Sequence, residues 1–326
     1  MGALRRELAH GVRRRARALP LGPHGLPRSG GGGLSPTRFR RLAVASVAAL
    51  YVIVITGSLV RLTGSGLGCE SWPGCEEGQF FPAADYHAFV EFGNRVVGIF
   101  PITLSILVAW AARGRPAWLF RTAVAVAVLT VAEAPLGLAT IRYELPPEMV
   151  IVHFLVALLA LGGAVVIALA ALREERGTAA IAFPKELRWA GLVLVTACLG
   201  LVVSGTFSTA AGPHSGDPDV THRLGGLPDA LWVHVRVTAI FGAAFLFLLG
   251  YLGARRELAP WLFRFALGVL AVLLVQMAVG EIQYRLELPW GIVALHVALA
   301  AAVWALTVAL VTMLWRPPAW LAPGRG

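Results

Sequence analysis

Long apolar segments recur along the chain, and they constrain its fold more strongly than any other feature of the sequence. Each approaches the roughly 20 residues that a helix needs to cross a lipid bilayer. Only 14% of the 326 residues are charged, whereas a soluble domain has about 25%, so too little polar sequence remains to cover a soluble protein. Backbone groups in lipid must hydrogen-bond within their own segment, so the sequence predicts an all-α integral membrane protein. Eight transmembrane helices are expected, at residues 42–62, 89–112, 122–141, 148–172, 189–209, 231–254, 265–283 and 290–315.

Lysine and arginine are distributed unevenly over the connections, which indicates how the helices are oriented. Of these residues, 22 lie before residue 42 or in the connections that follow every second helix, and 4 lie in the intervening connections. Both termini are therefore expected in the cytoplasm, and the net charge of +10 is a signal of topology rather than of nucleic-acid binding. The outward connections are then residues 63–88, 142–147, 210–230 and 284–289.

The N-terminal region, residues 1–41, is rich in arginine and contains the glycine run 30–33. We expect it to be a disordered basic cytoplasmic tail, because it lacks the apolar core of a secretory signal. A mitochondrial targeting segment, which is also rich in arginine and poor in acidic residues, is the alternative interpretation.

The two halves of the chain resemble each other. The segment GLATIRYELPPEMVIVH at residues 137–153 aligns with GEIQYRLELPWGIVALH at 280–296, a shift of 143 residues. Each half has an even number of helices, so both halves share one orientation, as in a parallel repeat. We expect two pseudo-symmetric four-helix bundles side by side. Their boundaries are predicted at 42–172 and 189–315, with a cytoplasmic linker at 173–188 and a C-terminal cytoplasmic tail at 316–326.

Three histidines, His153, His234 and His296, each lie a few residues past the outer entry of an expected helix. At 1.5 Å per residue, all three should lie roughly 5–10 Å below the outer surface. Ionisable side chains within a membrane span are costly, which makes them functional candidates by default. Two histidines on neighbouring helices can bind opposite faces of one flat cofactor, and imidazole suits haem iron. In the second half this pair would be His234 and His296.

The first half offers a different set of ligands. His153 matches His296 in the repeat, but Asn94, followed by Arg95, stands where a counterpart of His234 is expected. Two imidazoles saturate the axial positions of iron and favour electron transfer, whereas one imidazole leaves a face open for a porphyrin that binds as substrate. The alternative is that Asn94 is a polar packing residue and that the first half binds nothing.

Two acidic residues lie within the expected helices of the first half. Glu91 precedes Arg95 by four residues, so it either forms a helix-stabilising pair or handles protons and charge during an oxidation. Glu133 is in the middle of a span and aligns with Gln276 at the 143-residue shift. We expect Glu133 to be protonated or hydrogen-bonded at that depth, and a proton path is the alternative.

The stretch TGSGLGCESWPGC, Thr63 to Cys75, holds two of the three cysteines, Cys69 and Cys75. The connection is expected to face outward, into a compartment where disulfides persist. Their short separation, with Pro73 and Gly74 between them, allows a tight loop to bring the sulfurs together. A disulfide is therefore predicted, and two free thiols are the alternative.

These motifs together resemble one known family. The run TGSGLGCESWPGC followed by VEFGNRVVG, the spacing from LP to histidine in the fourth and eighth spans, and GPHSGD are similar to the haem A synthase family. The resemblance covers nearly the whole chain after the tail. It implies eight helices in two pseudo-equivalent bundles, and an enzyme that oxidises the C8 methyl group of haem O in successive steps to the formyl group of haem A.

The resemblance also implies roles for particular residues. It implies a haem b cofactor on His234 and His296, and a substrate haem site with His153 beside Asn94 and Arg95. It implies a catalytic Glu91 and a disulfide between Cys69 and Cys75. Many family members have histidine at the position of Asn94, so this chain departs from the family there. A carbocation route quenched by water and an oxygen-activating route are both compatible with the sequence.

The resemblance finally implies partners and a location. The expected partners are the substrate haem O, a haem O synthase that supplies it, the assembly of terminal oxidases of the cytochrome c oxidase type, and an unidentified electron acceptor. A homo-oligomer is a further expectation, and nucleic acid is not an expected partner. The expected location is a bacterial plasma membrane, with the haem sites near the outer face. The alternative functions are a cytochrome b-type electron carrier without a substrate and a transporter.

Overall fold

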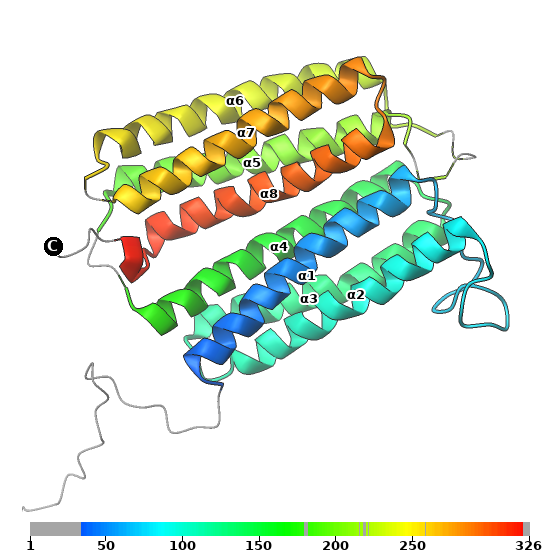
Figure 1. Cartoon of the computed structure of the whole chain (residues 1–326), viewed down its shortest axis with the longest axis horizontal. Helices are drawn as coiled ribbons and strands as arrows, with labels where there is room; N and C mark the ends of the chain where they lie inside the picture. Colours follow the sequence, from blue (N-terminus) through cyan, green and yellow to red (C-terminus); the bar gives the residue numbers. More distant parts are fainter. Residues whose placement is uncertain are drawn as a thin grey trace, which may run out of the picture. The chain divides into compact units, whose positions relative to one another are not determined.

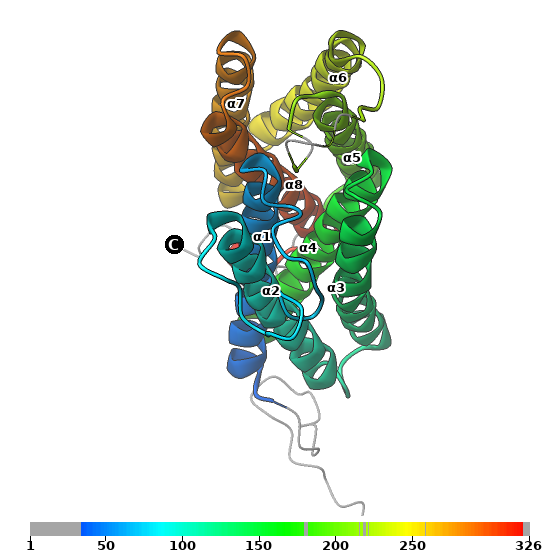
Figure 2. The ribbon, with the colours of Figure 1, turned by 90° about the vertical axis from the view of Figure 1, so that its right-hand side faces the viewer.

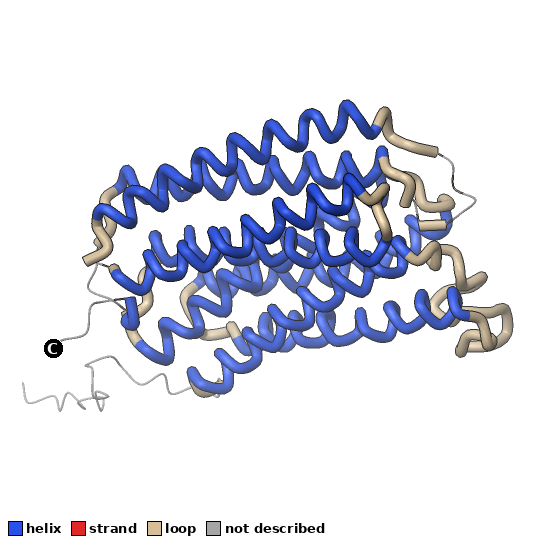
Figure 3. Tube along the Cα trace, turned by 45° about the horizontal axis from the view of Figure 1, so that its top comes forward, coloured by secondary structure: helices blue, strands red, loops and turns tan. Residues whose placement is uncertain are grey.

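The computed structural model describes residues 34–178, 182–214, 216–217, 220, 222–257 and 259–321. Within these residues it contains eight helices that are long and apolar enough to cross a membrane, and no strand (Figure 3). The protein is an all-α membrane protein, as expected. The helices are α1 Pro36–Leu62, α2 Tyr86–Ala111, α3 Ala117–Arg142, α4 Pro147–Arg176, α5 Lys185–Ala211, α6 Leu227–Ala254, α7 Pro260–Arg285 and α8 Trp290–Trp315 (Figure 1).

Several helices continue beyond the apolar segments, and this corrects part of the sequence prediction. Residues 36–41, assigned to a disordered tail, form the start of α1, where the Ser35 side chain accepts a hydrogen bond from the backbone of Arg38. Arg40 forms an ion pair with Glu175 on α4, so a charged turn is stabilised at the end of the helix. Residues 1–33, which hold the rest of the predicted tail, lie outside the described part.

The predicted linker and C-terminal tail are also partly ordered. Helix α4 continues to Arg176 and α5 begins at Lys185, both within the range 173–188 assigned to the linker. After α8, a short 3₁₀ helix forms at Ala319–Leu321, and the backbone of Ala319 donates a hydrogen bond to Gly177. Residues 316–321 therefore pack back against the end of α4 and are not a free tail.

The helices pack in two rings. In the first ring α1 packs on α2, α2 on α3, α3 on α4, and α4 on α1; α5 to α8 pack in the same cyclic order (Figures 1 and 2). Among the described residues, the diagonal helices of a ring, α2 with α4 and α6 with α8, do not pack on each other. Each ring can therefore present side chains from opposite sides to a common interior. The overall pseudo-symmetry of the two bundles stays a prediction.

Helices α4 and α8 form the centre of the helix assembly. About half of the apolar stretch of each is buried, 44% and 50%, against 17–28% in the other helices. The indole of Trp304 on α8 donates a hydrogen bond of 2.7 Å to the backbone oxygen of Leu158 on α4. Tyr51 on α1 donates one of 2.9 Å to the backbone of Ala298 on α8. These contacts join the two rings through their most buried helices.

The α3–α4 and α7–α8 turns have the same backbone conformation. Glu144 and Leu145 have φ of 59° and 57°, and Glu287 and Leu288 have φ of 61° and 62°. Positive φ is uncommon for residues other than glycine. In both turns the second of these residues donates a 2.8 Å backbone hydrogen bond to the end of the preceding helix. The 143-residue sequence repeat thus corresponds to a repeated local structure at this end of the helices.

Candidate functional site

The four candidate iron-binding side chains lie on the diagonal helices of the two rings. Asn94 is on α2 and His153 on α4, while His234 is on α6 and His296 on α8. Within the described residues no hydrogen bond joins the two members of either pair, so each keeps a separate set of partners. In each ring the two candidate side chains lie on diagonal helices, which do not pack on each other among the described residues.

Each repeat-related histidine, His153 and His296, lies against a glycine on the preceding helix. A Cβ atom added at Gly137 on α3 would lie 3.7 Å from Cε1 of His153. A Cβ atom added at Gly280 on α7 would lie 3.0 Å from Cε1 of His296, closer than nearly all real contacts of this kind. Glycine at these positions therefore leaves space for the imidazole rings.

The other two candidates show the same arrangement. A Cβ atom added at Gly205 on α5 would lie 3.1 Å from Cε1 of His234, and one at Gly57 on α1 would lie 3.9 Å from Nδ2 of Asn94. Gly57 in TGSLVRLTG and Gly205 in SGTFSTAAG also correspond in the two halves of the sequence, at a shift of 148 residues, slightly different from that of the later segments. Asn94 thus occupies, relative to its glycine, the place that His234 occupies in the second half.

In the second half, polar partners contact both histidines. The hydroxyl of Ser204 on α5 lies 2.9 Å from Nδ1 of His234. On α7, the amide nitrogen of Gln276 lies 3.2 Å from Nε2 of His296 and donates a 3.1 Å hydrogen bond to its backbone oxygen. Such contacts fix the orientation of a ring and decide which nitrogen is free to bind a metal.

In the first half, His153 contacts an acidic side chain. Its Nδ1 lies 2.6 Å from Oε2 of Glu133 on α3, although the ring is not aligned for a well-formed hydrogen bond. Glu133 and Gln276 correspond at the 143-residue shift, so the repeat-related histidines contact repeat-related side chains of different chemistry. Glu133 thus lies close to His153, and the expectation that it is protonated or hydrogen-bonded stays a prediction.

The donor groups of both rings fit a haem better than a bare metal ion. Among the described residues no cluster of three or more His, Cys, Asp or Glu side chains could hold an ion. A haem brings its own four in-plane nitrogen ligands and needs only axial groups, which two side chains on opposed helices can supply. Nδ1 of His296 and Oδ1 of Asn94 are buried and have no hydrogen-bond partner. Each candidate site therefore contains a buried polar atom that a bound group could contact.

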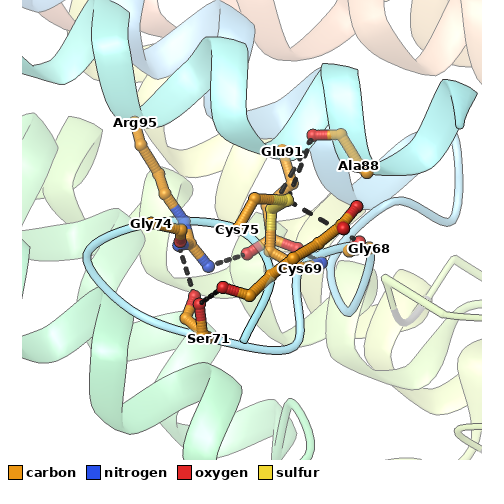
Figure 4. A network of polar contacts seen from close by, with 9 residues as sticks. Gly68, Cys69, Ser71, Gly74, Cys75, Ala88, Glu91 and Arg95 are labelled. Atoms are coloured by element: carbon orange, nitrogen blue, oxygen red, sulfur yellow. Dashed lines mark hydrogen bonds and ion pairs between the residues drawn. A yellow bond between two sulfur atoms is a disulfide. The ribbon is translucent and has the colours of Figure 1, made fainter. Parts of the chain in front are cut away.

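The cysteine loop lies at the N-terminal end of α2, and Cys69 and Cys75 form the expected disulfide (Figure 4). Glu91 is 3% exposed, and its Oε2 accepts a 2.9 Å hydrogen bond from the backbone of Cys69. Its Oε1 lies 2.5 Å from Arg95, which donates in turn to the backbone oxygens of Ser71, at 2.8 Å, and of Gly74. The predicted Glu91–Arg95 pair is therefore present, and it anchors the disulfide loop to the helix.

The outer connections of the two halves also contact each other. Arg61 at the end of α1 donates a 2.5 Å hydrogen bond to the backbone oxygen of His214, whose Nε2 lies 2.7 Å from the backbone oxygen of Leu288. The backbone of Gly66 donates a 2.8 Å hydrogen bond to Gly216. His214 thus links the two halves. No sequence pattern could have predicted this, because the contacts join three separate connections.

Comparison with known proteins places the chain in a family. A sequence model of the family described as "Cytochrome oxidase assembly protein" matches residues 40–308. A protein named "Heme A synthase" from Symbiobacterium thermophilum is 36% identical over 141 residues, 42% of this chain and 46% of that protein. One of the same name from Bacillus licheniformis is 29% identical over 133 residues, 39% and 43% of the two chains.

A longer match involves a protein with another name. The "Protoheme IX farnesyltransferase" of Thermus thermophilus is 28% identical over 282 residues, which are 80% of this chain and 46% of that protein. In each of these matches the chain spans about half of the length of the curated relative. The family match covers most of the described helices, including all four candidate ligands. The chain therefore belongs to the cytochrome oxidase assembly protein family, the family that contains the haem A synthases.

Proposed function

We propose that the protein is a haem A synthase, which oxidises the C8 methyl group of haem O to the formyl group of haem A. The observation that carries the proposal is the unequal pair of donor sets. His234 on α6 and His296 on α8 each lie against a glycine. In the first ring, Asn94 on α2 and His153 on α4 each lie against a glycine in the same way. One half is built like a cofactor site, and the other like a site that leaves one axial position weakly bound.

His234 and His296 would hold a haem b as the cofactor. Haem supplies one-electron redox chemistry when it is bound. Ser204 and Gln276 hold the two rings from the neighbouring helices, and Gly205 and Gly280 leave them room. Held by two imidazoles, this haem would serve electron transfer rather than the binding of substrate or oxygen.

His153 would hold the substrate haem O, with Asn94 facing it from α2 and Arg95 one residue further along. Oxidation of a methyl to a formyl group removes electrons and protons and adds an oxygen atom, so the enzyme also needs an external electron acceptor. An amide is a weak ligand for iron compared with imidazole, so a product held on His153 alone can dissociate and be passed on. Release matters here because haem A is made for another protein.

Glu91 would act on the substrate from the outer end of α2. Both of its carboxylate oxygens are engaged, one by the backbone of Cys69 and one by Arg95, so its position is fixed. A fixed carboxylate beside the substrate can stabilise positive charge that develops during oxidation. It also holds the disulfide loop, so we propose that Glu91 couples closure of the loop to the chemistry beneath it.

The partners and the location follow from the same proposal. A farnesyltransferase that acts on protohaem has a region similar to this chain, which supports a haem O synthase as the source of the substrate. Terminal oxidase assembly would receive the product, and the chain would function alone or as a homo-oligomer. The distribution of Lys and Arg supports a bacterial plasma membrane as the location, with both termini in the cytoplasm and both haem sites near the outer face.

Pigment extraction tests the proposal. The full chain is expressed in cells that contain a haem O synthase and no other haem A source, and the extracted haems are separated by chromatography. Haem A is expected only when the chain is present. Haem O alone, together with an intact haem b spectrum, would instead indicate a cytochrome b-type electron carrier without its own substrate.

A further inference from the structure

Glu133 contacts the candidate substrate ligand but has no part in the proposed oxidation. It lies on α3, its side chain is 18% exposed, and its Oε2 is 2.6 Å from Nδ1 of His153 on α4. Its second oxygen, Oε1, is buried without a hydrogen-bond partner. An acidic side chain at this depth is costly, so a contact this close indicates that it serves the histidine.

The corresponding side chain in the other half is neutral. Gln276 presents its amide nitrogen, a donor, to the ring of His296 and to the backbone of that residue. A carboxylate can only accept a proton from the ring, whereas an amide nitrogen can only donate one. The first half thus differs from the second at two positions. Asn94 takes the place of the imidazole of His234, and Glu133 takes the place of the amide of Gln276.

The carboxylate has a defined effect on an imidazole that binds iron. A carboxylate that accepts the Nδ1 proton leaves Nε2 with its lone pair free for a metal and fixes the plane of the ring. Glu133 lies within reach of Nδ1 of His153, although the ring is not aligned for that hydrogen bond here. The negative charge makes the imidazole a stronger electron donor, which stabilises ferric over ferrous iron. This effect is needed most where a single imidazole must hold the haem.

We propose that Glu133 is a positioning residue that orients His153 and strengthens it as the only strong axial ligand of the substrate haem. Gln276 gives the cofactor haem no such charge, so the two haems would differ in potential as well as in ligands. This inference rests on the proposed function, because it takes His153 as the ligand of haem O.

The test compares Glu133→Gln with the matched reciprocal variant Gln276→Glu. The full chain, purified in detergent with its haem b, is titrated with haem O, and the affinity, the midpoint potential and the electron paramagnetic resonance spectrum are measured. His153→Ala gives the baseline without haem O at this site. The haem b spectrum reports in every variant whether the protein is folded.

We expect Glu133→Gln to weaken haem O binding by about 10- to 100-fold, as is typical when a partner of a metal ligand is lost. The midpoint potential of bound haem O should shift upward, while the haem b spectrum stays unchanged. Gln276→Glu should instead shift the haem b potential downward and leave haem O binding unchanged. Equal affinity and potential in Glu133→Gln and the unmodified chain would overturn the proposal.

A folding defect is handled by a further variant. If Glu133→Gln also loses haem b, the affinity for haem O is measured in Glu133→Asp, which keeps a carboxylate. Haem O affinity restored toward that of the unmodified chain supports the proposal, and a loss as large as in Glu133→Gln overturns it. If the expected shifts are seen but no haem A forms in cells, the role of Glu133 stands and the proposed enzyme activity is contradicted.

Discussion

The two rings of helices are built on the same plan and differ where iron would bind. In the ring of α5 to α8, two histidines lie on the diagonal helices α6 and α8, with Ser204 and Gln276 as neutral partners. In the ring of α1 to α4, a histidine and Asn94 take the corresponding places, and Glu133 is the partner. Under the proposed function, the shared plan would let one scaffold hold two haems. The differences would let one of them be kept as a cofactor and the other be released as a product.

The largest expected effect comes from removing a cofactor ligand. His234→Ala or His296→Ala should abolish the low-spin haem b signal in the absorption spectrum, because a single imidazole remains for that haem. His222→Ala is the matched control, since that histidine is exposed and lies 3.9 Å from Glu148. A haem b signal that survives both changes would show that the second ring does not bind haem through these residues.

The next largest effect is expected on the formation of haem A, without loss of haem b. Glu91→Ala should retain haem b yet lower haem A formation by about 100-fold or more, the usual scale for a lost acid–base or charge-stabilising group. Extracted pigments and the haem b spectrum from one preparation separate the two effects. Glu91→Gln, which can still accept the Cys69 hydrogen bond, separates the charge from loop anchoring. Full activity in Glu91→Ala would leave this acid with a structural role only.

A third change removes one of the differences between the rings. Asn94→His should give the first ring a second imidazole, and Gly57 leaves space for it because the nearest Asn94 atom is 3.9 Å from an added Cβ. Haem O bound to this variant should acquire a low-spin spectrum like that of haem b. A spectrum unchanged from that of the unmodified chain would mean that residue 94 does not face the haem.

The glycines that lie against the candidate ligands allow a further test of the comparison between the two rings. Gly205→Ala should displace the ring of His234, because the added Cβ lies 3.1 Å from it, and overpacking of this kind costs about 1–3 kcal/mol. Haem b occupancy after purification should fall. Gly242→Ala on α6 is the control, since an added Cβ there meets nothing within 4 Å. Equal haem b content in the two variants would remove the packing argument for this site.

The smallest expected effect concerns the outer loop, which only the first ring has in this form. Cys69→Ser should expose the Cys75 thiol to a labelling reagent and lower the stability of the loop by roughly 2 kcal/mol, as expected for a short disulfide-closed loop. Haem b should be retained. Labelling of both thiols in the untreated protein would contradict the disulfide.

The positions of the helices could be predicted from sequence because apolar segments of membrane length have few alternatives. The exact ends of helices such as α1 and α4 could not be predicted, since the turns beyond the apolar segments depend on partners such as Glu175 for Arg40. The candidate histidines could be found by their matched depth. Their partners Ser204 and Glu133 required the packing of neighbouring helices, which a single sequence does not reveal. Glu91 and Arg95 were readable as an i,i+4 pair, but the contact of Glu91 with the cysteine loop was not.

The most direct test of the account is the electron paramagnetic resonance spectrum of the purified full chain after saturation with haem O. The account predicts two different signals: a bis-imidazole low-spin signal that His234→Ala removes, and a distinct signal that His153→Ala removes. A colourless protein, or two identical bis-imidazole signals, would contradict it.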